Sequence, residues 1–167
     1  MDIQTDIKQW DGKSAKDIGD IYQRYCNAAS FSSIIIGMID NESLQKGATW
    51  LLKHHLEQKR QLTTKEIHTV FNTLTKLEPW ESKLQILQSL PYLPVQKRDK
   101  KKVEVFLRKC LVETNKFVRA WAYNGFYELA VQYPEYQQET QLFLEMAMRD
   151  EAPSVKARIR NIMKKGF

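Results

Sequence analysis

The sequence has no apolar run long enough to cross a membrane. Its longest such run, IIIGMI at residues 34–39, has six residues, whereas a transmembrane helix needs about 20. The N-terminal stretch MDIQTDIKQWDGK carries acids throughout and has no apolar core, so we do not expect a secretory signal peptide. These absences predict a cytoplasmic protein with no membrane partner.

Cysteine is also scarce, which leaves little material for disulfides or thiolate metal sites. Cys26 and Cys110 are the two cysteines, and each lies on an apolar stripe with helical spacing, which places its thiol on a buried helix face. We therefore favour two core residues over a disulfide, a metal site or a catalytic thiol. The apolar neighbours that share these stripes are Ile18, Ile21, Tyr22 and Tyr25, and Val103, Phe106, Leu107 and Leu111.

The alternating pattern of β-strands is nearly absent, whereas signals for helix ends are frequent. Ser14 with Asp17, and Thr63 with Glu66, resemble capping boxes. Asn41, Asp99 and Asn115 are expected N-caps, and Pro79, Pro134 and Pro153 suit a first helical turn. The sequence thus predicts an all-α protein with about nine helices, near 14–28, 31–39, 42–57, 64–76, 79–90, 99–113, 116–132, 134–149 and 153–165.

No connection between these helices is long enough to mark a domain boundary, so residues 1–167 are expected to form a single domain. PYLPVQKRDKKK at 91–102 is the best candidate for a flexible loop. The helices group into hairpins near 14–39, 42–76, 79–113 and 116–150, followed by a capping helix at 153–165.

Two interleaved series of apolar positions repeat along the chain. The first aligns Leu44, Trp80, Val118 and Val155, at spacings of 36, 38 and 37 residues. The second aligns Ile34, Val70, Phe106 and Leu142, and with them Met38, Leu74, Cys110 and Met146, at 36 residues each time. A shared period of this length indicates an α-solenoid of stacked antiparallel helical hairpins, each buried against its neighbours. A four-helix-type bundle is the alternative, but it has no physical reason to repeat in this way.

The stretch KFVRAWAYNGFYELA at 116–130, followed by DEAPSVKARIRNIMKK, resembles HEAT-like, armadillo-type repeats. In that family a helix commonly opens with a Val-Arg pair and small residues, which Val118, Arg119, Ala120 and Ala122 match. The resemblance covers residues 40–167, with 14–39 as a divergent first hairpin, and extends to small bacterial HEAT-repeat proteins of single-domain length. It implies an interaction module and specifies no reaction.

One polar face remains on the first helix series after the apolar stripes are removed, and we expect it to line a concave binding surface. It includes Thr49, Gln85, Ile86, Ser89 and Tyr127, and its candidate contacts are Trp50, Lys53, Tyr123, Asn124, Arg160 and Lys164. Trp50 is the first choice because an exposed Trp off the apolar stripe needs an explanation. The alternative is that Trp50 covers a seam between hairpins.

Basic residues cluster twice, and each cluster has a structural and a functional interpretation. Lys100, Lys101 and Lys102 belong to a solvated loop or a phosphate site, and Lys156 and Arg158 to a solubilising terminal cap or an anion-binding patch. The clusters are uneven: residues 153–167 hold 5 basic residues and no acid. Arg119 and Lys156 are expected to pair with an acid or a helix end of the adjacent repeat.

No catalytic, metal or cofactor site is predicted. His54 and His55 are adjacent and point about 100° apart on a helix, so they cannot share a metal as an i, i+4 pair does. Some HEAT-like proteins are DNA glycosylases acting on alkylated purines, but the polar face holds no carboxylate beyond Glu81 to carry over.

The sequence therefore predicts a non-enzymatic module that binds another macromolecule, most plausibly a protein. Nucleic-acid binding through the basic patches is the runner-up, and ligand binding or alkylpurine glycosylase activity is a remote alternative. Neither the oligomeric state nor the identity of the partner follows from the sequence.

Overall fold

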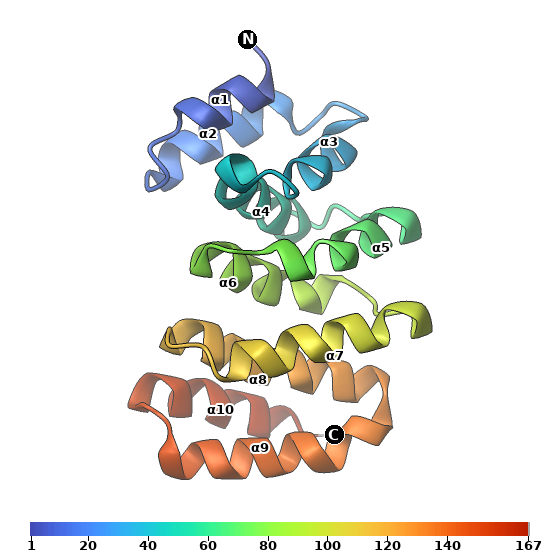
Figure 1. Cartoon of the computed structure of the whole chain (residues 1–167), viewed down its shortest axis with the longest axis vertical. Coiled ribbons are helices and arrows are strands. Elements are labelled where there is room, and N and C mark those ends of the chain that lie inside the picture. Colours follow the sequence, from blue (N-terminus) through green and yellow to red (C-terminus); the bar gives the residue numbers. More distant parts are fainter. Residues whose placement is uncertain (167) are drawn as a thin grey trace. The chain divides into compact units, whose positions relative to one another are not determined.

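The computed structural model describes residues 1–166, and within them the chain is helical, with ten α-helices, three short 3-10 helices and no strand (Figure 1). The contacts divide the chain into two compact units, Met1–Tyr92 and Leu93–Phe167. The expected hairpin at 79–113 crosses this boundary, so its two helices are described with different units. All nine predicted helices are present, and a tenth precedes them.

The N-terminal unit contains six α-helices and two 3-10 helices. These are α1 (Ile3–Gln9), α2 (Ala15–Tyr25), α3 (Phe31–Met38), α4 (Glu42–Glu57), α5 (Thr64–Asn72), η1 (Leu74–Lys76), α6 (Trp80–Ser89) and η2 (Leu90–Tyr92). Helix α4 is central, because α1, α2, α3 and α6 all pack against it. Three predicted caps are present, since Ser14, Asn41 and Thr63 accept backbone N–H bonds at the starts of α2, α4 and α5.

The unpredicted helix α1 begins at Asp2, whose side chain accepts a hydrogen bond from the Thr5 backbone N–H. It packs closely on α4 at Gly47, where an added Cβ would lie 2.6 Å from the Ile7 side chain. Gly47 is therefore needed for close approach and not for backbone freedom. The seven residues of α1 are too few to show a helical repeat of apolar positions, which explains why this helix was not predicted.

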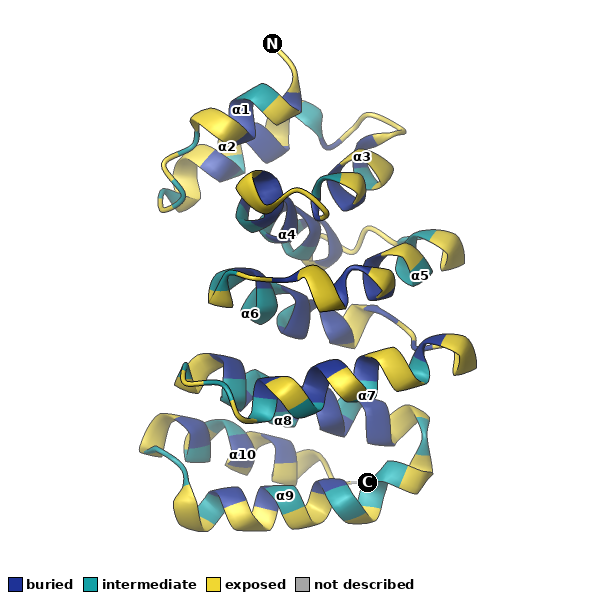
Figure 2. Ribbon diagram, in the orientation of Figure 1, coloured by how far each residue is buried: buried dark blue, intermediate teal, exposed yellow. Residues whose placement is uncertain are grey.

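The C-terminal unit contains α7 (Lys97–Leu111), α8 (Lys116–Gln132), η3 (Pro134–Tyr136), α9 (Gln137–Asp150) and α10 (Pro153–Lys165). Helix α8 packs against α7, α9 and α10, and it is the most thoroughly buried helix of the unit (Figure 2). Residues of α8, α9 and α10 share one apolar core, which includes Tyr127, Leu144, Val155, Ile159 and Ile162. Cys26 and Cys110 are both buried, as predicted.

The first apolar series is correct at three helices and displaced by two residues at α6. Trp80, its predicted anchor, is 42% exposed, whereas Ser82 is fully buried. The buried positions therefore align Leu44, Ser82, Val118 and Val155. Eight residues after Ser82, the buried residue is Leu90, and not Gln88, which lies eight residues after Trp80. The displacement was not predicted because two buried positions of α6 hold serines, Ser82 and Ser89. A search for repeated apolar residues does not recognise a buried serine as a core position.

The second series is displaced by one residue at each end relative to its middle. Ile34 is 41% exposed and Leu142 is 53% exposed, although both were aligned with the buried Val70 and Phe106. Burial instead aligns Ile36, Phe71, Leu107 and Leu144, which follow the predicted positions by two, one, one and two residues. The spacing is therefore 35, 36 and 37 residues. The constant period of 36 was wrong because helices and turns of unequal length carry the successive repeats.

The predicted flexible loop at 91–102 is largely helical. Helix α7 begins at Lys97 with Gln96 as its N-cap, so Asp99 lies inside the first turn and is buried. Pro79 similarly occupies the N-cap of α6 instead of its first turn, whereas Pro134 and Pro153 begin η3 and α10 as predicted. The lysine-rich composition suggested a loop, but these lysines occupy the exposed side of a helix.

Candidate binding surface

Trp50 lies on α4 as part of a small aromatic stack in the N-terminal unit. Its ring stacks on His54 at 4.9 Å with an interplanar angle of 18°. The His54 ring meets the edge of Tyr22 from α2 at 4.6 Å. Trp50 remains partly exposed, and Lys53 nearby forms an ion pair with Glu57 at 3.3 Å between Nζ and Oε1. The stack holds Trp50 in one orientation at low entropic cost, which suits an interface anchor.

The two adjacent histidines have structural surroundings. His55 Nδ1 lies 3.2 Å from the hydroxyl of Tyr22, and its ring lies against Phe31 at 5.0 Å. Burial lowers the pKa of both His54 and His55, so both rings are neutral at physiological pH. Within residues 1–166, no group of three or more His, Cys, Asp or Glu side chains is placed to hold a metal ion.

Part of the predicted polar face is buried where one helix packs against the next. Thr49 is fully buried and donates from Oγ1 to Gln85 Oε1, which links α4 to α6. Tyr127 belongs to the core shared with α10, and Tyr123 packs partly buried against that core. Asn124 is also buried, as are Ile86 and Ser89. The prediction that Asn124 is an accessible contact on this face is therefore wrong.

On α10 the equivalent positions are exposed. Arg160, Asn161 and Lys164 follow Tyr123, Asn124 and Tyr127 by 37 residues, and all three are exposed. Helix α8 is covered at these positions by α10, whereas the described chain has no helix beyond α10. Arg160 and Lys164 are exposed, as a contact surface requires. The predicted continuous surface that joins them to Asn124 is interrupted, because Asn124 is buried.

The lysines at the start of α7 are paired with carboxylates. Lys100 Nζ donates to Glu135 Oε1 at 2.7 Å, and Lys101 Nζ lies 3.3 Å from Glu104 Oε2. Lys102 Nζ lies 3.5 Å from the buried Asp99 Oδ1. The hydrogen bond to Glu135 raises the pKa of Lys100. These pairs favour the structural interpretation of this cluster over a phosphate site.

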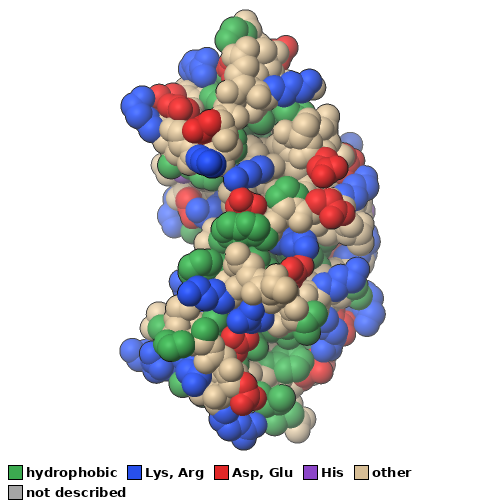
Figure 3. Space-filling model, turned by 60° about the vertical axis from the view of Figure 1, so that its left-hand side comes forward, with side chains coloured by type: hydrophobic (Ala, Val, Ile, Leu, Met, Phe, Trp, Pro, Cys, Tyr) green, Lys and Arg blue, Asp and Glu red, His purple; other side chains and the backbone are tan. Residues whose placement is uncertain are grey.

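The basic residues of α10 are arranged differently. Arg158 lies over the Trp121 ring at 4.1 Å, and Lys165 lies over the Tyr127 ring at 5.5 Å. Within residues 1–166, neither Arg160 nor Lys164 has a carboxylate within ion-pair distance. Figure 3 shows the Lys and Arg side chains of this unit, in the lower part of the view, interspersed with hydrophobic side chains. Arg160 and Lys164 thus carry charges with which no acid of residues 1–166 forms an ion pair.

Two residues predicted to join adjacent repeats do so. Arg119 forms a two-pronged ion pair with Glu151, with Nε–Oε1 at 2.8 Å and Nη2–Oε2 at 3.0 Å, and Nη1 donates to the carbonyls of Glu113 and Thr114. This bond to Arg119 lowers the pKa of Glu151. Lys156 Nζ donates to the Arg149 carbonyl at the end of α9, at 3.3 Å.

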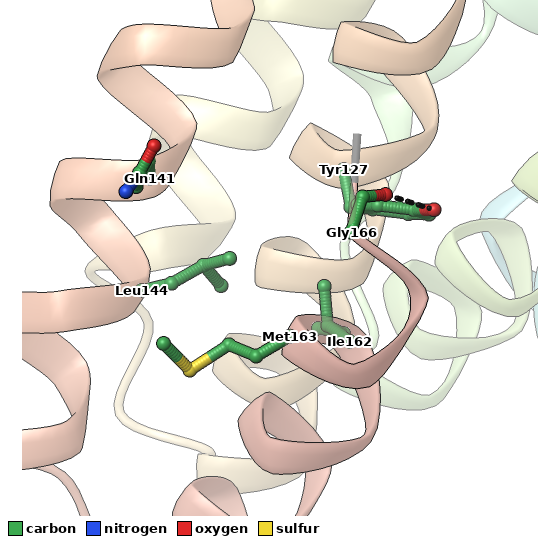
Figure 4. A pocket seen from close by; sticks show the side chains of 6 residues that line it. All are labelled: Tyr127, Gln141, Leu144, Ile162, Met163 and Gly166. Atoms are coloured by element: carbon green, nitrogen blue, oxygen red, sulfur yellow. Dashed lines mark hydrogen bonds between the residues drawn. The ribbon is translucent and has the colours of Figure 1, made fainter.

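The C-terminal unit has two pockets of similar size. One, of about 290 Å³, lies between α8 and α9 and is lined by Arg119, Tyr123, Met146, Ala147, Asp150 and Glu151. The other, of about 300 Å³, is lined by Tyr127, Gln141, Leu144, Ile162, Met163 and Gly166. Figure 4 shows Leu144 of α9 and Met163 of α10 pointing into the space between their helices, while the Tyr127 hydroxyl donates to the Gly166 carbonyl.

Trp121 and Met163 lie on the apolar stripes of α8 and α10, yet neither is fully buried. Met163 aligns with Leu52, Leu90 and Phe126, which are all buried, yet it is 45% exposed. The missing signal was positional, because no helix of residues 1–166 covers this side of α10. A residue on the apolar stripe of α10 can therefore be exposed, although the sequence pattern of α10 is the same as that of the covered helices.

Comparisons with known proteins agree with this architecture. A family model described as a HEAT repeat domain matches residues 11–166. Neither the curated proteins nor the solved structures include a match. None of the helices described between residues 1 and 166 has the length and apolar character needed to cross a membrane.

Proposed function

Because the chain belongs to the HEAT repeat family, an α-solenoid of helical repeats, we propose that it is a non-enzymatic cytoplasmic module that binds another protein. Repeat arrays of this kind expose broad surfaces on rigid helices, which suits docking better than enclosure of a small substrate. Two carboxylates of the C-terminal unit support the non-enzymatic part of this proposal, because each is bound by side chains of the fold. Glu151 is held by Arg119, and Tyr136 donates to Glu104; burial, together with this hydrogen bond, raises the pKa of Tyr136 to about 12.

The observation that carries the proposal is the exposed surface of α10. Arg160, Asn161 and Lys164 occupy repeat positions that serve helix packing in α8. Exposed charge at the end of an array also improves solubility, but Arg158 and Met163 extend this surface with an aromatic stack and an apolar pocket. Trp50 and Lys53 on α4 are proposed as a separate contact region in the N-terminal unit.

Nucleic-acid binding is the second candidate, and the charge distribution favours it. The N-terminal unit holds 11 basic and 11 acidic residues, whereas the C-terminal unit holds 15 basic and 9 acidic residues. The entire net charge of +6 is therefore located in the C-terminal unit. The exposed cations of α10 span one short helix, so they would contact few phosphates and give a shallow salt dependence.

Site-specific photo-crosslinking in cells tests the proposed function. A benzophenone amino acid at Asn161 should crosslink a discrete protein that survives nuclease treatment. The same group at Gln138, an exposed position on α9, is the matched control and should not crosslink that protein. Products that contain only nucleic acid, or identical products from both positions, would contradict the proposal.

A further inference from the structure

The C-terminal unit leaves α10 without the helix neighbours that cover α8. Helix α8 packs against α7, α9 and α10, whereas α10 packs against α8 and α9 among the described residues. Met163 is the clearest sign of this difference, since its repeat equivalents Leu52, Leu90 and Phe126 are at most 3% exposed. Among residues 1–166, the position beside Met163 of α10 is therefore open.

This open position contains an apolar pocket. Leu144, Ile162 and Met163 provide its apolar lining, and Gln141 and the Tyr127 ring complete it. A volume of about 300 Å³ accommodates a single large aliphatic side chain with room for its backbone to approach. In the interior of a helical array, side chains of an adjacent helix fill such spaces.

Two exposed cations flank Met163, one of the residues that line the pocket. Arg160 precedes Met163 by three residues and Lys164 follows it directly, so both flank Met163 on the exposed side of α10. No carboxylate of residues 1–166 lies within ion-pair distance of either cation. The helices that pack in the chain bring their own acids to such cations: Lys46 of α4 meets Glu81 of α6, and Arg108 of α7 meets Glu139 of α9.

We propose that this surface, formed by Arg160, Met163, Lys164 and the pocket beside them, binds an amphipathic helix of a partner protein. The helix would insert one aliphatic anchor into the pocket and direct carboxylates toward Arg160 and Lys164. The repeat geometry supplies the helical character of the ligand, and charge complementarity supplies its acidic flank. This inference rests on the proposed function and names the chemistry of the partner.

A synthetic helix provides the probe. It is a fluorescein-labelled, alanine-rich peptide with a row of Glu residues beside one central Leu, and its binding to the full chain is measured by fluorescence anisotropy at about 0.1 M salt, where the Debye length is about 10 Å. We expect a dissociation constant of the order of 10–100 µM. Matched peptides replace the Leu with Ser, or every Glu with Lys.

Two double variants with the same change in charge distinguish binding at this site from non-specific attraction of the acidic peptide to the basic C-terminal unit. R160E/K164E should weaken binding by roughly 10-fold or more. K100E/K101E, which alters paired lysines of the same unit, should change binding by less than about 2-fold, because screening limits its reach. Circular dichroism checks that both variants keep their helix content.

The anchor is tested by a double-mutant cycle between the peptide Leu→Ser change and Met163→Ser. Both single changes should weaken binding, and together they should cost less than the product of their separate effects, because they remove one contact. Independent effects would overturn the anchor. Binding that R160E/K164E leaves unchanged, or no binding at all, would overturn the acidic helix.

Other occupants would also be recognised. Tighter binding of a labelled oligothymidine than of the peptide would overturn the proposal in favour of nucleic acid. A dimer in light scattering that R160E/K164E dissociates would assign the surface to a second copy of this chain. If Asn161 crosslinks a protein but the peptide fails, the proposed function stands and the acidic helix is rejected.

Discussion

The two basic clusters of the C-terminal unit have similar compositions and different surroundings. At the start of α7, Lys100 and Lys101 lie beside Glu135 and Glu104. On α10, Arg160 and Lys164 have no such neighbour among residues 1–166. A run of lysines in a sequence therefore does not identify a binding surface, because carboxylates from another helix or from the same turn decide whether the charges remain available.

The position of each cluster within its helix reinforces the difference. The α7 lysines occupy the first two turns, where the helix dipole disfavours cations, so acids nearby are needed to hold them. Lys164 and Lys165 occupy the last turn of α10, where the dipole favours them. The α7 pairs thus serve the stability of the fold, whereas the α10 cations are stable without partners.

The largest expected effect comes from breaking the paired cluster at Glu104. Glu104 is 12% exposed at its side chain and accepts hydrogen bonds from Lys101, Arg108 and Tyr136. Glu104→Ala should lower the free energy of unfolding by about 2 kcal/mol, because the half-buried Tyr136 hydroxyl loses its acceptor. Urea unfolding measures the change, with Glu145→Ala on the exposed side of α9 as the control. Equal losses in the two variants would contradict the account.

Acid should weaken the paired clusters next. The pKa values of Glu104 and Glu151 lie below their usual value of 4.5 in the folded chain. For Glu104, the opposing effect of burial is outweighed by hydrogen bonds from Tyr136, Arg108 and Lys101, and for Glu151 the main cause is the hydrogen bond from Arg119. Their stabilisation is fully present above the unfolded pKa and is lost as pH falls through the lowered folded pKa. The free energy of unfolding should therefore fall below about pH 4.5, and Glu151→Gln should flatten that fall. An equally steep fall in the variant would show that Glu151 does not contribute.

Glu128 on α8 is a carboxylate whose pKa is shifted in the opposite direction from those of Glu104 and Glu151. Burial raises its pKa and outweighs the favourable charge of Lys165, so its ionised form costs stability as pH rises through the unfolded pKa. Glu128→Gln should raise the free energy of unfolding at pH 7 by roughly 0.5–1 kcal/mol, with little effect at pH 3.5. A loss of stability at pH 7 would show instead that Glu128 and Lys165 act as a stabilising pair.

The smallest effect on stability is expected from α10 itself. R160E/K164E should lower the free energy of unfolding by about 0.5 kcal/mol or less, because neither side chain has an ion-pair partner to lose and only the solvent-screened interaction of Lys164 with the helix dipole is reversed. The thermal midpoint at two salt concentrations measures this directly. A large loss would indicate that these residues stabilise the fold and are not available for binding.

Much of the helical architecture was predictable because buried stripes repeat along the chain. The displaced alignments at Trp80, Ile34 and Leu142 show the limit of such patterns, since buried serines and unequal turns are invisible to them. The site was less predictable for the same reason. Asn124 and Asn161 occupy equivalent repeat positions, and only the presence or absence of a following helix separates a buried residue from an exposed one.

Quantitative acetylation of lysines, in the purified protein and in native lysate, tests the central claim most directly. In the purified protein Lys164 should react several-fold faster than Lys100, since the bond to Glu135 raises the pKa of Lys100. In lysate, binding of a partner to α10 should slow the reaction of Lys164 and leave that of Lys100 unchanged. Equal rates for Lys164 in both samples would contradict the claim that α10 is a binding surface.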